Sequence, residues 1–256
     1  MRHLAERRHR RVEGAFVVEG IQPVWRAVQA GAAIETIVIA PDLLRDSPAL
    51  RMVEDRAAAG VPVARLSREL FTRLSDRDGP SGLAAIVRGR VRPLDDLPVG
   101  PGSMFVALHE IGNPGNLGTI IRTADATGAA GVVLIGDASD PFAPGAVKAS
   151  MGSLFATEIR HAPTLDAFFD WAGGRGVPVM ATSGAGPDHH WSARYRTPLA
   201  LLFGSEGQGL PAGALARSDL VVRIPMVGTA ESLNLAVAVG VMLYEVRRGA
   251  PAGSGG

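Results

Sequence analysis

The sequence predicts an α/β protein whose larger, C-terminal part is a parallel sheet covered by helices. Continuous apolar runs in the second half alternate with segments of helical character. Such runs are typical of strands buried on both faces, and the alternation is typical of a doubly wound sheet. A smaller alternation of the same kind precedes residues 92–102, which hold three prolines and two glycines and so have a linker composition.

These observations predict a small α/β domain at 1–91, a linker at 92–102, a larger α/β domain at 103–248 and a disordered Gly/Ala/Pro/Ser tail at 249–256. The strands expected in the first domain are 16–18, 36–39, 61–63 and 83–87, and its helices are 21–31, 49–59 and 67–74. The strands expected in the second domain are 104–108, 132–135, 177–181, 199–203 and 220–224, and its helices are 117–128, 144–153, 165–173, 208–217 and 232–248.

Composition excludes several classes of protein. The chain is 46% apolar and 20% charged, an ordinary balance for a globular protein. It has no run of 18 or more apolar residues and no apolar centre of a signal peptide near the N-terminus. The absence of cysteine removes disulfides, thiolate metal sites and cysteine nucleophiles. We therefore expect a cytoplasmic enzyme without a metal or a membrane segment, and we expect the His189-His190 pair to lie in a surface loop.

Positive charge is concentrated at the N-terminus, although the net charge of the chain is only +1. Five arginines and two histidines lie between positions 2 and 11. This basic arm either binds RNA phosphates, where affinity comes from released counterions, or forms a solvated helix face. Lys148 is the only lysine, so nearly all positive charge is carried by arginine, the better bidentate ligand for phosphate.

The first candidate motif, residues 113–124, directly follows an expected strand and opens a helix. Asn116 is placed to cap this helix through its side-chain oxygen, and free amides at a helix start favour anions. A plain turn and cap explains the proline, glycine and asparagine residues, but not Arg122, which has apolar neighbours in sequence. Asn116 and Arg122 are about 120° apart on a helical wheel, so their spacing alone does not make them a contact pair.

The second motif, residues 201–210, is an apolar strand that runs into three glycines around Glu206. Ligands collect at the carboxyl ends of strands in open α/β sheets, so this turn is a candidate binding loop. Its spacing matches neither the dinucleotide fingerprint nor the P-loop. A simple turn between a strand and a helix is the alternative interpretation.

The third motif spans residues 224–236 and contains Ser232 and Asn234. We expect Ser232 to cap the following helix and Asn234 to fall in its first turn. A serine cap is common and needs no functional explanation. An asparagine at an otherwise apolar helix start needs a polar partner, which favours a functional role for Asn234.

Together, in this order and spacing, the three motifs resemble the SpoU/TrmH branch of the SPOUT methyltransferases. That family shows Asn-x-Gly-x-x-x-Arg, then an apolar strand with Gly-x-Glu-Gly-x-Gly, then Ile-Pro-Met followed by Ser-Leu-Asn. The matching residues here are Asn116 to Arg122, 204–209, 224–226 and 232–234. The resemblance covers roughly residues 103–248. Residues 10–20 are similar to the family's substrate-binding domain, which resembles small ribosomal proteins that bind kinked RNA.

The resemblance implies a fold and a cofactor. The fold is an α/β sheet whose C-terminal part forms a trefoil knot, an arrangement that is otherwise nearly absent from proteins. The cofactor is S-adenosylmethionine, held in a bent shape by the knot loops. The residues implied in holding it are Gly204, Ile224, Met226 and Leu233, with Thr182 near the methionine end. The resemblance further implies a homodimer with the C-terminal helix in the contact.

The implied reaction is attack of a ribose 2′-oxygen on a sulfonium methyl, which the enzyme must align while it helps to remove the hydroxyl proton. Family proposals make Arg122 the base, but the pKa of arginine exceeds about 12. We expect instead that Arg122 clamps a phosphate and polarises the hydroxyl. The hydroxyl is then positioned by Asn116, Ser232 and Asn234, and Glu206 orients Arg122 or the helix ends.

Ribosomal RNA is the first expectation for the substrate, because a separate N-terminal domain is present, and transfer RNA is the second. Two other interpretations stay open. One is an inactive family member that only binds RNA, against which the intact motif residues argue. The other is a nucleotide-binding enzyme of unknotted topology, which binding of S-adenosylmethionine rather than ATP or NAD would exclude.

Overall fold

The protein is described here by a computed structural model that covers residues 1–45, 47–75 and 79–249. These residues form two compact units. The first contains Met1–Arg90 and Asp140–Ala156, and the second contains Val91–Ser139 and the residues from Thr157 onward. Of the tail predicted to be disordered, Gly249 ends the last helix, and residues 250–256 lie outside the described part.

The first unit is built on a four-stranded sheet in the order β1-β4-β2-β3. The central strand β4 pairs antiparallel with β1 and β2, and β3 pairs parallel with β2. The strands are β1 (Ala15–Glu19), β2 (Ile34–Ile39), β3 (Val63–Arg65) and β4 (Leu83–Arg88). The helices of this unit are η1 (Arg2–Ala5), α1 (Arg7–Glu13), α2 (Ile21–Gln29), α3 (Ala49–Ala58), α4 (Arg68–Leu74), α6 (Pro144–Ser150) and η2 (Ser153–Phe155). The sequence predicted all four strands, with β3 shifted by two residues.

Residues 140–156 belong to the first unit, whereas the division predicted from the sequence placed them in the domain 103–248. Two contacts hold them there. The guanidinium of Arg10 lies 2.7 Å from the Asp140 carboxylate and is almost fully buried. Phe16 of β1 stacks on Phe142 with ring centroids 4.5 Å apart. The spacing of sequence motifs does not show such contacts, because the partners are more than a hundred residues apart.

The second unit is built on an eight-stranded sheet in the order β10-β12-β9-β11-β6-β7-β8-β5. Every adjacent pair in it is parallel, as the continuous apolar runs predict. Its strands are β5 (Arg92–Pro93), β6 (Met104–His109), β7 (Gly131–Ile135), β8 (Ile159–Ala162), β9 (Val179–Thr182), β10 (Asp188–His189), β11 (Leu199–Phe203) and β12 (Leu220–Arg223). The sequence missed β5, β8 and β10, which are two to four residues long and rich in polar side chains.

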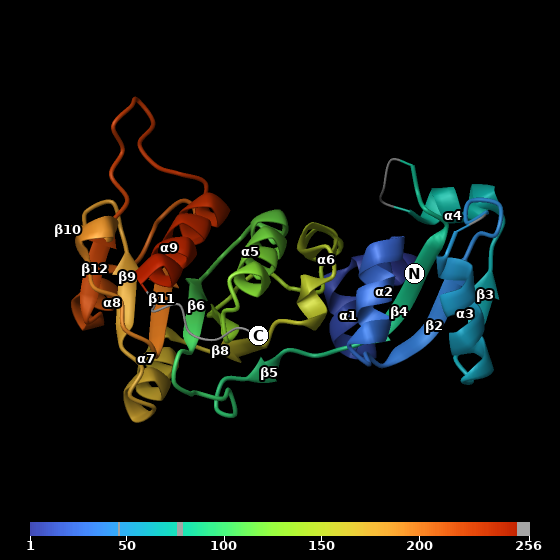
Figure 1. Ribbon diagram of the computed structural model, residues 1–256, viewed down its shortest axis with the longest axis horizontal. Coiled ribbons are helices and arrows are strands. Elements are labelled where there is room, and N and C mark those ends of the chain that lie inside the picture. Colours follow the sequence, from blue (N-terminus) through green and yellow to red (C-terminus); the bar gives the residue numbers. More distant parts are fainter. Residues whose placement is uncertain (46, 76–78, 250–256) are drawn as a thin grey trace. The chain divides into compact units, whose positions relative to one another are not determined.

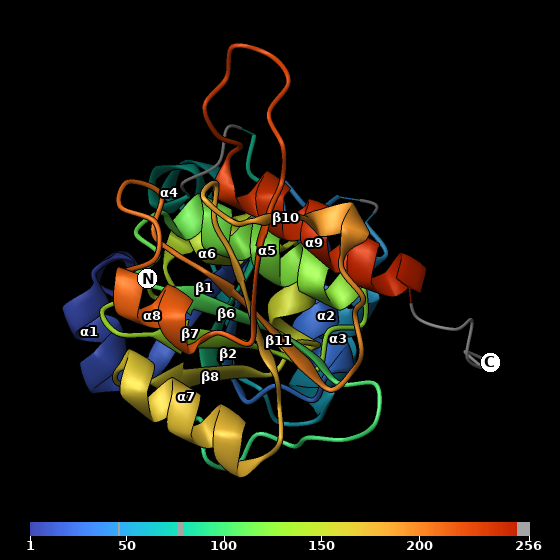
Figure 2. The same ribbon diagram turned by 90° about the vertical axis from the view of Figure 1, so that its left-hand side faces the viewer.

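Helices cover both faces of the large sheet (Figures 1 and 2). α5 (Pro114–Ala126) and α9 (Leu235–Gly249) pack side by side on one face. α7 (Leu165–Gly174) and α8 (Ala212–Arg217) pack against the other. Because side chains alternate along a strand, Phe105 of β6 faces α7, where its ring meets that of Trp171 at 5.4 Å between centroids.

Strand order places a ligand-binding edge in this unit. From β6 the chain adds β7 and β8 on one side of the sheet, and it then crosses to add β9 on the other side. β11 lies between β9 and β6, at the point where the strand order reverses. In open α/β sheets such a reversal leaves a crevice at the carboxyl ends of the strands. The segments that follow β9, β11 and β12 therefore meet at one edge. None of the helices in the part of the chain that the structure describes is long and apolar enough to cross a membrane.

Candidate active site

The sequence predicted Asn116 as the cap of helix α5, but the capping residue is Asn113. The Asn113 Oδ1 atom accepts hydrogen bonds from the backbone amides of Gly115 at 2.8 Å and Asn116 at 3.1 Å. Pro114 is the first helical residue, where its fixed φ and missing N–H carry no cost. The helix therefore begins earlier than predicted, and the Asn116 side chain is free to act elsewhere.

Asn116 connects two other segments through the two ends of its amide. Its Nδ2 atom donates to Glu206 Oε1 at 3.1 Å, and its Oδ1 atom accepts from Asn234 Nδ2 at 3.0 Å. Glu206 also accepts from the backbone amide of Gly112 through Oε2 at 3.3 Å. The fold therefore joins three of the five residues that the sequence predicted as catalytic. They come from α5, from the turn after β11 and from the start of α9.

Asn234, and not Ser232, caps α9. Its Oδ1 atom accepts from the backbone amides of Ala236 at 2.9 Å and Val237 at 3.4 Å. α9 begins at Leu235, so Ser232 lies three residues before the helix, exposed and in the preceding loop. The prediction of a serine cap is wrong because the asparagine has the same capping ability and stands next to the first turn.

Hydrogen bonds hold the Glu206 carboxylate in its charged form. Partial burial raises the pKa of this group, but hydrogen bonds from the Asn116 side chain and from the backbone of Glu206, Gly112 and Asn113 outweigh it. The net effect is a pKa below the ordinary value of a glutamate. A carboxylate with a lowered pKa is a weak base, so Glu206 is better suited to orienting Asn116 than to accepting a proton.

The glycines after β11 form a turn that closes on itself. The Gly209 amide donates to the Ser205 carbonyl at 3.0 Å, and the two residues form an isolated bridge. A Cβ on Gly204 would lie 2.0 Å from the Gly209 carbonyl carbon and 2.4 Å from the Leu210 nitrogen, so no larger residue fits there. The predicted binding loop is therefore a compact turn rather than the start of a helix, and α8 begins only at Ala212.

A pocket of about 1060 Å³ lies beside this turn, among the segments that follow β9, β11 and β12. Its walls include all five residues that the resemblance implied for cofactor binding: Thr182, Gly204, Ile224, Met226 and Leu233. Glu206, Ser232 and Asn234 also line it. Sites for small molecules and cofactors span roughly 300–1,000 Å³, so the pocket has room for a nucleoside-sized cofactor.

One feature of the pocket wall points to a ligand. The hydroxyl oxygen of Thr182 is buried and has no hydrogen-bond partner among the described residues. Such an orphaned group is costly unless a ligand or water supplies a partner. On the same wall, Arg223 donates to the carbonyls of Gly186 at 2.6 Å and Pro187 at 2.9 Å, and its guanidinium lies 2.9 Å from the His189 ring. It thereby holds the segment after β9 against the end of β12.

Arg223 was not among the site residues that the sequence predicted. One signal was present, since an arginine ends the apolar run of β12 directly before the Ile-Pro-Met motif.

The prediction that the His189-His190 pair lies in a surface loop was wrong in part. His190 is only 8% exposed, because it lies in the short turn η3 (His190–Ser192), which packs against α9.

Arg122 lies apart from this network. It is exposed on α5, while Ile120, Ile121 and Ala124 are buried beneath it, which explains a charged residue in an apolar stretch. Within the described residues its guanidinium makes no ion pair or side-chain hydrogen bond, and it does not line the pocket. Its cation therefore faces solvent on the helix that carries Asn116. The expectation that Glu206 orients Arg122 finds no contact in the structure; Glu206 bonds to Asn116 and to backbone instead.

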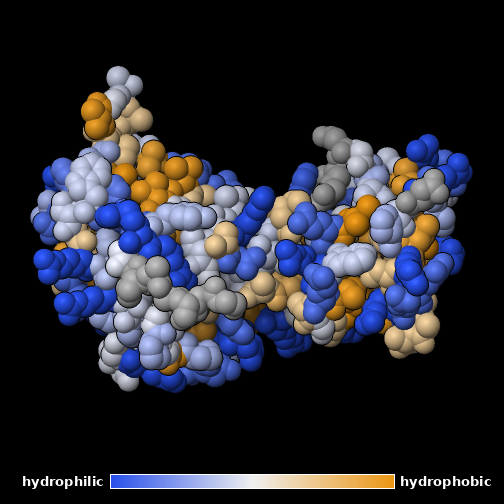
Figure 3. All heavy atoms as spheres, viewed as in Figure 1, coloured by the Kyte–Doolittle hydropathy of each residue, from blue (hydrophilic) through white to orange (hydrophobic). Residues whose placement is uncertain are grey.

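The segment between β12 and α9 projects from the rest of the second unit (Figures 1 and 2). Val227 at its outer part is 97% exposed. Hydrophobic residues gather on the surface at the base of this segment (Figure 3). No group of three or more metal-ligating side chains occurs in the ranges that the structure describes.

A parallel α/β sheet with such a pocket at the carboxyl ends of its strands defines a domain that binds a small-molecule cofactor. The comparisons with known proteins give the family. Residues 103–244 match the SpoU rRNA Methylase family, and residues 1–85 match the MRM3-like substrate binding domain. The chain belongs to the SpoU rRNA methylase family.

Relatives and solved structures agree with this assignment over nearly the whole chain. A 23S rRNA (uridine(2479)-2′-O)-methyltransferase of Streptomyces viridochromogenes is 32% identical, over 96% of this chain and 86% of that protein. The 23S rRNA (guanosine(2553)-2′-O)-methyltransferase RlmP of Bacillus subtilis is 27% identical, over 95% and 93%. The crystal structure of an AdoMet-bound rRNA methyltransferase from Sinorhizobium meliloti superposes with a TM-score of 0.88 at 38% identity, covering 96% of this chain and 92% of that one.

Proposed function

We propose that this protein transfers a methyl group from S-adenosylmethionine to a ribose 2′-hydroxyl of ribosomal RNA. The observation that carries the proposal is the pocket whose wall unites the five residues implied for the cofactor with Glu206, Ser232 and Asn234. The family match and the relatives, which are named as 23S rRNA 2′-O-methyltransferases, support it.

The residues of the pocket fit S-adenosylmethionine. Three glycines of the turn 204–209 line the pocket, and backbone without side chains lets a ligand approach closely. Ile224, Met226 and Leu233 supply apolar surface for the adenine and ribose. The orphaned hydroxyl of Thr182 supplies a hydrogen-bond partner for a polar end of the ligand. When bound, this cofactor supplies an electrophilic methyl on a sulfonium, so that a carbon–sulfur bond breaks as the carbon–oxygen bond forms.

The part played by the protein is to position the attacking hydroxyl and to ease the loss of its proton. Asn116 and Asn234 form a hydrogen-bonded pair, and Glu206, which accepts a hydrogen bond from Asn116, lines the pocket together with Asn234. We assign the positioning of the ribose to this pair together with the exposed hydroxyl of Ser232. Alignment of two reactants in this way supplies a large share of a rate enhancement.

Arg122 is assigned to the RNA phosphate next to the reacting ribose. Its exposed guanidinium offers a planar fork of donors that suits a phosphate, and nothing in the described chain occupies it. A cation there favours the oxyanion that develops as the hydroxyl loses its proton to solvent water. An arginine cannot itself be the base at neutral pH, since its pKa exceeds about 12.

Four further assignments complete the proposal. We assign RNA binding to the N-terminal region and catalysis to the region 103–248. We assign a trefoil knot to the C-terminal part, as the family resemblance implies. We assign a homodimer through α9, and a place of action in the cytoplasm, where ribosomal RNA is found in bacteria.

Calorimetry and a methyl-transfer assay test the function. The full chain should bind S-adenosylmethionine and neither ATP nor NAD. It should transfer a tritiated methyl group to ribosomal RNA from a strain that lacks the gene, and nuclease digestion should recover the label as one 2′-O-methylnucleoside. Transfer RNA from the same strain serves as the competing substrate. Label in a base, in transfer RNA alone, or in no RNA despite cofactor binding would overturn the proposal.

Arg122→Lys tests the phosphate clamp. A lysine keeps the charge but loses the bidentate fork, so turnover should fall at least about tenfold while the affinity for S-adenosylmethionine stays the same. Arg175→Lys, at an exposed position after α7, is the matched control and should leave turnover unchanged. Unchanged turnover of Arg122→Lys would remove the bidentate role, and unchanged RNA affinity would remove the clamp.

A further inference from the structure

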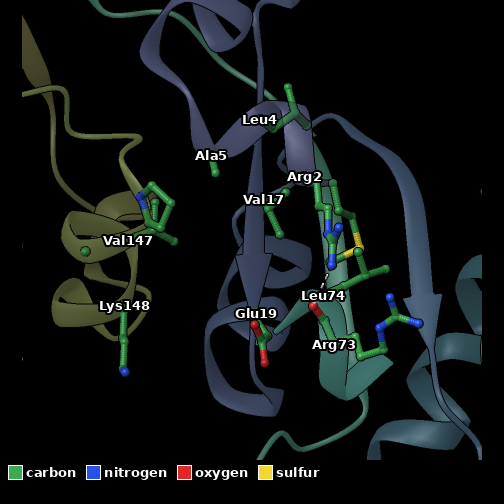
Figure 4. A pocket seen from close by; sticks show the side chains of 12 residues that line it. Arg2, Leu4, Ala5, Val17, Glu19, Arg73, Leu74, Val147 and Lys148 are labelled. Atoms are coloured by element: carbon green, nitrogen blue, oxygen red, sulfur yellow. Dashed lines mark hydrogen bonds between the residues drawn. The ribbon is translucent and has the colours of Figure 1, made fainter. Parts of the chain in front are cut away.

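The first unit contains a pocket of its own, of about 360 Å³ (Figure 4). η1 and β1 form one side of it, and α6 with Val147 and Lys148 forms the other. The end of α4 contributes Arg73 and Leu74. The pocket is therefore lined by residues from both family matches: the substrate-binding domain at 1–85 and the methylase family at 103–244. It exists because residues 140–156 pack on the N-terminal region.

Three cations surround this pocket without a carboxylate partner among the described residues. They are Arg2, Arg73 and Lys148, all exposed. Arg2 donates only to the backbone carbonyl of Arg73, at 3.4 Å. Lys148 is the only lysine of the chain, and its side chain extends from α6 on the side of the pocket opposite β1 (Figure 4). Unpaired cations that converge on a cavity favour an anionic ligand.

One carboxylate lies in the same pocket. Glu19 is half-buried at the end of β1, and its Oε1 atom accepts a hydrogen bond from the Ser75 hydroxyl at 2.5 Å. The Oε2 atom accepts no hydrogen bond from any described residue. Glu19 thus presents one open acceptor at a fixed orientation. A simple anion gains nothing from it, whereas a ligand that also carries N–H donors does.

The remaining wall is apolar. Leu4, Val17, Leu74 and Val147 line it. The pocket therefore combines cations for a phosphate, an acceptor for an N–H group and apolar surface for a flat ring. A nucleotide carries all three complementary features. The volume lies near the lower end of the range of about 300–1,000 Å³ for small-ligand sites, which suits a single nucleotide rather than a helix of RNA.

We propose that this pocket holds one unstacked nucleotide of the RNA substrate, with its base between the apolar wall and Glu19 and its phosphate on the cations. The proposal rests on the proposed function, because that function supplies the RNA. Proteins that read RNA recognise mainly unstacked bases, which they hold by stacking and by hydrogen bonds to base edges. The nucleotide bound here is a recognition element and is not the one that receives the methyl group.

Two variants separate recognition in a pocket from attraction to a charged surface. Lys148→Ala removes one phosphate contact, so the affinity for unmethylated ribosomal RNA should fall about eightfold at ~0.1 M salt, and the salt dependence should weaken by about one charge. Ala5→Trp fills the pocket from η1 without a change in charge. It should weaken RNA binding about tenfold with an unchanged salt dependence, because the indole takes the place of the base while the charges around the pocket stay the same.

Filter binding with ribosomal RNA at several salt concentrations provides the measurement. Arg51→Ala on α3, an exposed arginine outside the pocket, is the matched control and should bind RNA within about twofold of wild type. Unchanged affinity of Ala5→Trp, with loss only in Lys148→Ala, would assign the region to a phosphate track and overturn the nucleotide pocket. Unchanged affinity of both would take RNA out of the pocket altogether.

Cofactor affinity separates this proposal from the function. Calorimetry with S-adenosylmethionine should give the wild-type affinity for both variants, because the cofactor pocket lies in the second unit. If wild type methylates ribosomal RNA and the variants bind it normally, the nucleotide pocket fails and the function stands. If wild type binds RNA but transfers no methyl group, and both variants lose RNA binding, the function fails and the pocket stands.

Discussion

At the scale of single residues, the site depends on one asparagine that uses both ends of its amide. Asn116 donates to Glu206 and accepts from Asn234, whose own oxygen caps α9. Removing the side chain of Asn116 would break both bonds, while Glu206 keeps its bond from Gly112 and Asn234 keeps its capping bonds. The two bonds give the Asn116 side chain a role other than capping α5.

Glu206→Gln should weaken S-adenosylmethionine binding about tenfold, because the neutral amide loses the charge-assisted bonds that hold the turn. The pKa of Glu206 is lowered in the folded state. Its contribution to stability is therefore complete above the ordinary value of 4.5 and disappears as the pH falls through the lower folded value. Thermal unfolding should show wild type more stable than the variant at pH 7, with the two converging in strong acid.

Glu231→Gln is the control for this prediction. Glu231 also lines the cofactor pocket, but it is exposed and makes no side-chain hydrogen bond within the described ranges. The same loss of charge there should leave the pH dependence of unfolding unchanged. Equal behaviour of both variants would mean that the network around Glu206 does not stabilise the turn.

At the scale of elements, the turn after β11 decides the shape of the cofactor pocket. Gly204 has no room for a side chain, since a Cβ would overlap the backbone of Gly209 and Leu210. Gly207 in the same turn has open space around it and an ordinary backbone conformation. The two glycines therefore have different requirements, although the sequence motif presents them alike.

Gly204→Ala should lower the affinity for S-adenosylmethionine at least about tenfold and reduce thermal stability by about 1–3 kcal/mol, because overlapping backbone must move. Gly207→Ala should change either quantity by less than about 0.5 kcal/mol. Calorimetry and thermal unfolding of the pair give the comparison. If Gly204→Ala binds the cofactor as wild type does, the turn is not part of the cofactor site.

At the scale of the whole molecule, apolar side chains remain exposed around α9. Trp191 of η3 and Val237 and Tyr244 of α9 are 52%, 52% and 59% exposed. η3 contacts α9, and Val237 and Tyr244 are seven residues apart, which places them on one face of that helix. Contiguous exposed apolar surface on a folded protein marks an interaction site. A second copy of the chain is the partner that the family resemblance implies.

Light scattering should therefore give the mass of a dimer for the full chain. Tyr244→Asp places an unpaired charge in the proposed contact and should shift the mass toward a monomer at micromolar concentration. Val12→Asp is the matched control, because Val12 is 70% exposed on α1 in the first unit. A wild-type monomer, or a Tyr244→Asp variant that stays fully dimeric, would contradict the assignment of α9 to the interface.

Much of the fold follows from local patterns. Continuous apolar runs identified five of the eight strands of the large sheet, because strands buried on both faces need no alternation. The three strands that were missed are short and include arginine, histidine, aspartate or proline, so they carry no apolar signal. Both capping residues were assigned wrongly, since several asparagine and serine side chains near a helix start have similar capping ability and only the backbone path selects one.

The sequence by itself determined the class of this protein: an α/β fold, a Gly-rich turn at a strand end, and motif residues in the order that the SpoU family shows. Only the tertiary structure decided which of those residues meet. Asn116, Glu206 and Asn234 come together, Arg122 stays apart on an exposed face, and residues 140–156 complete a pocket with the N-terminal region. The physical reason is that local propensity acts over a few residues. Contacts between segments separated by ninety or more positions depend on how strands are ordered in the sheet and on which side chains their packing leaves room for.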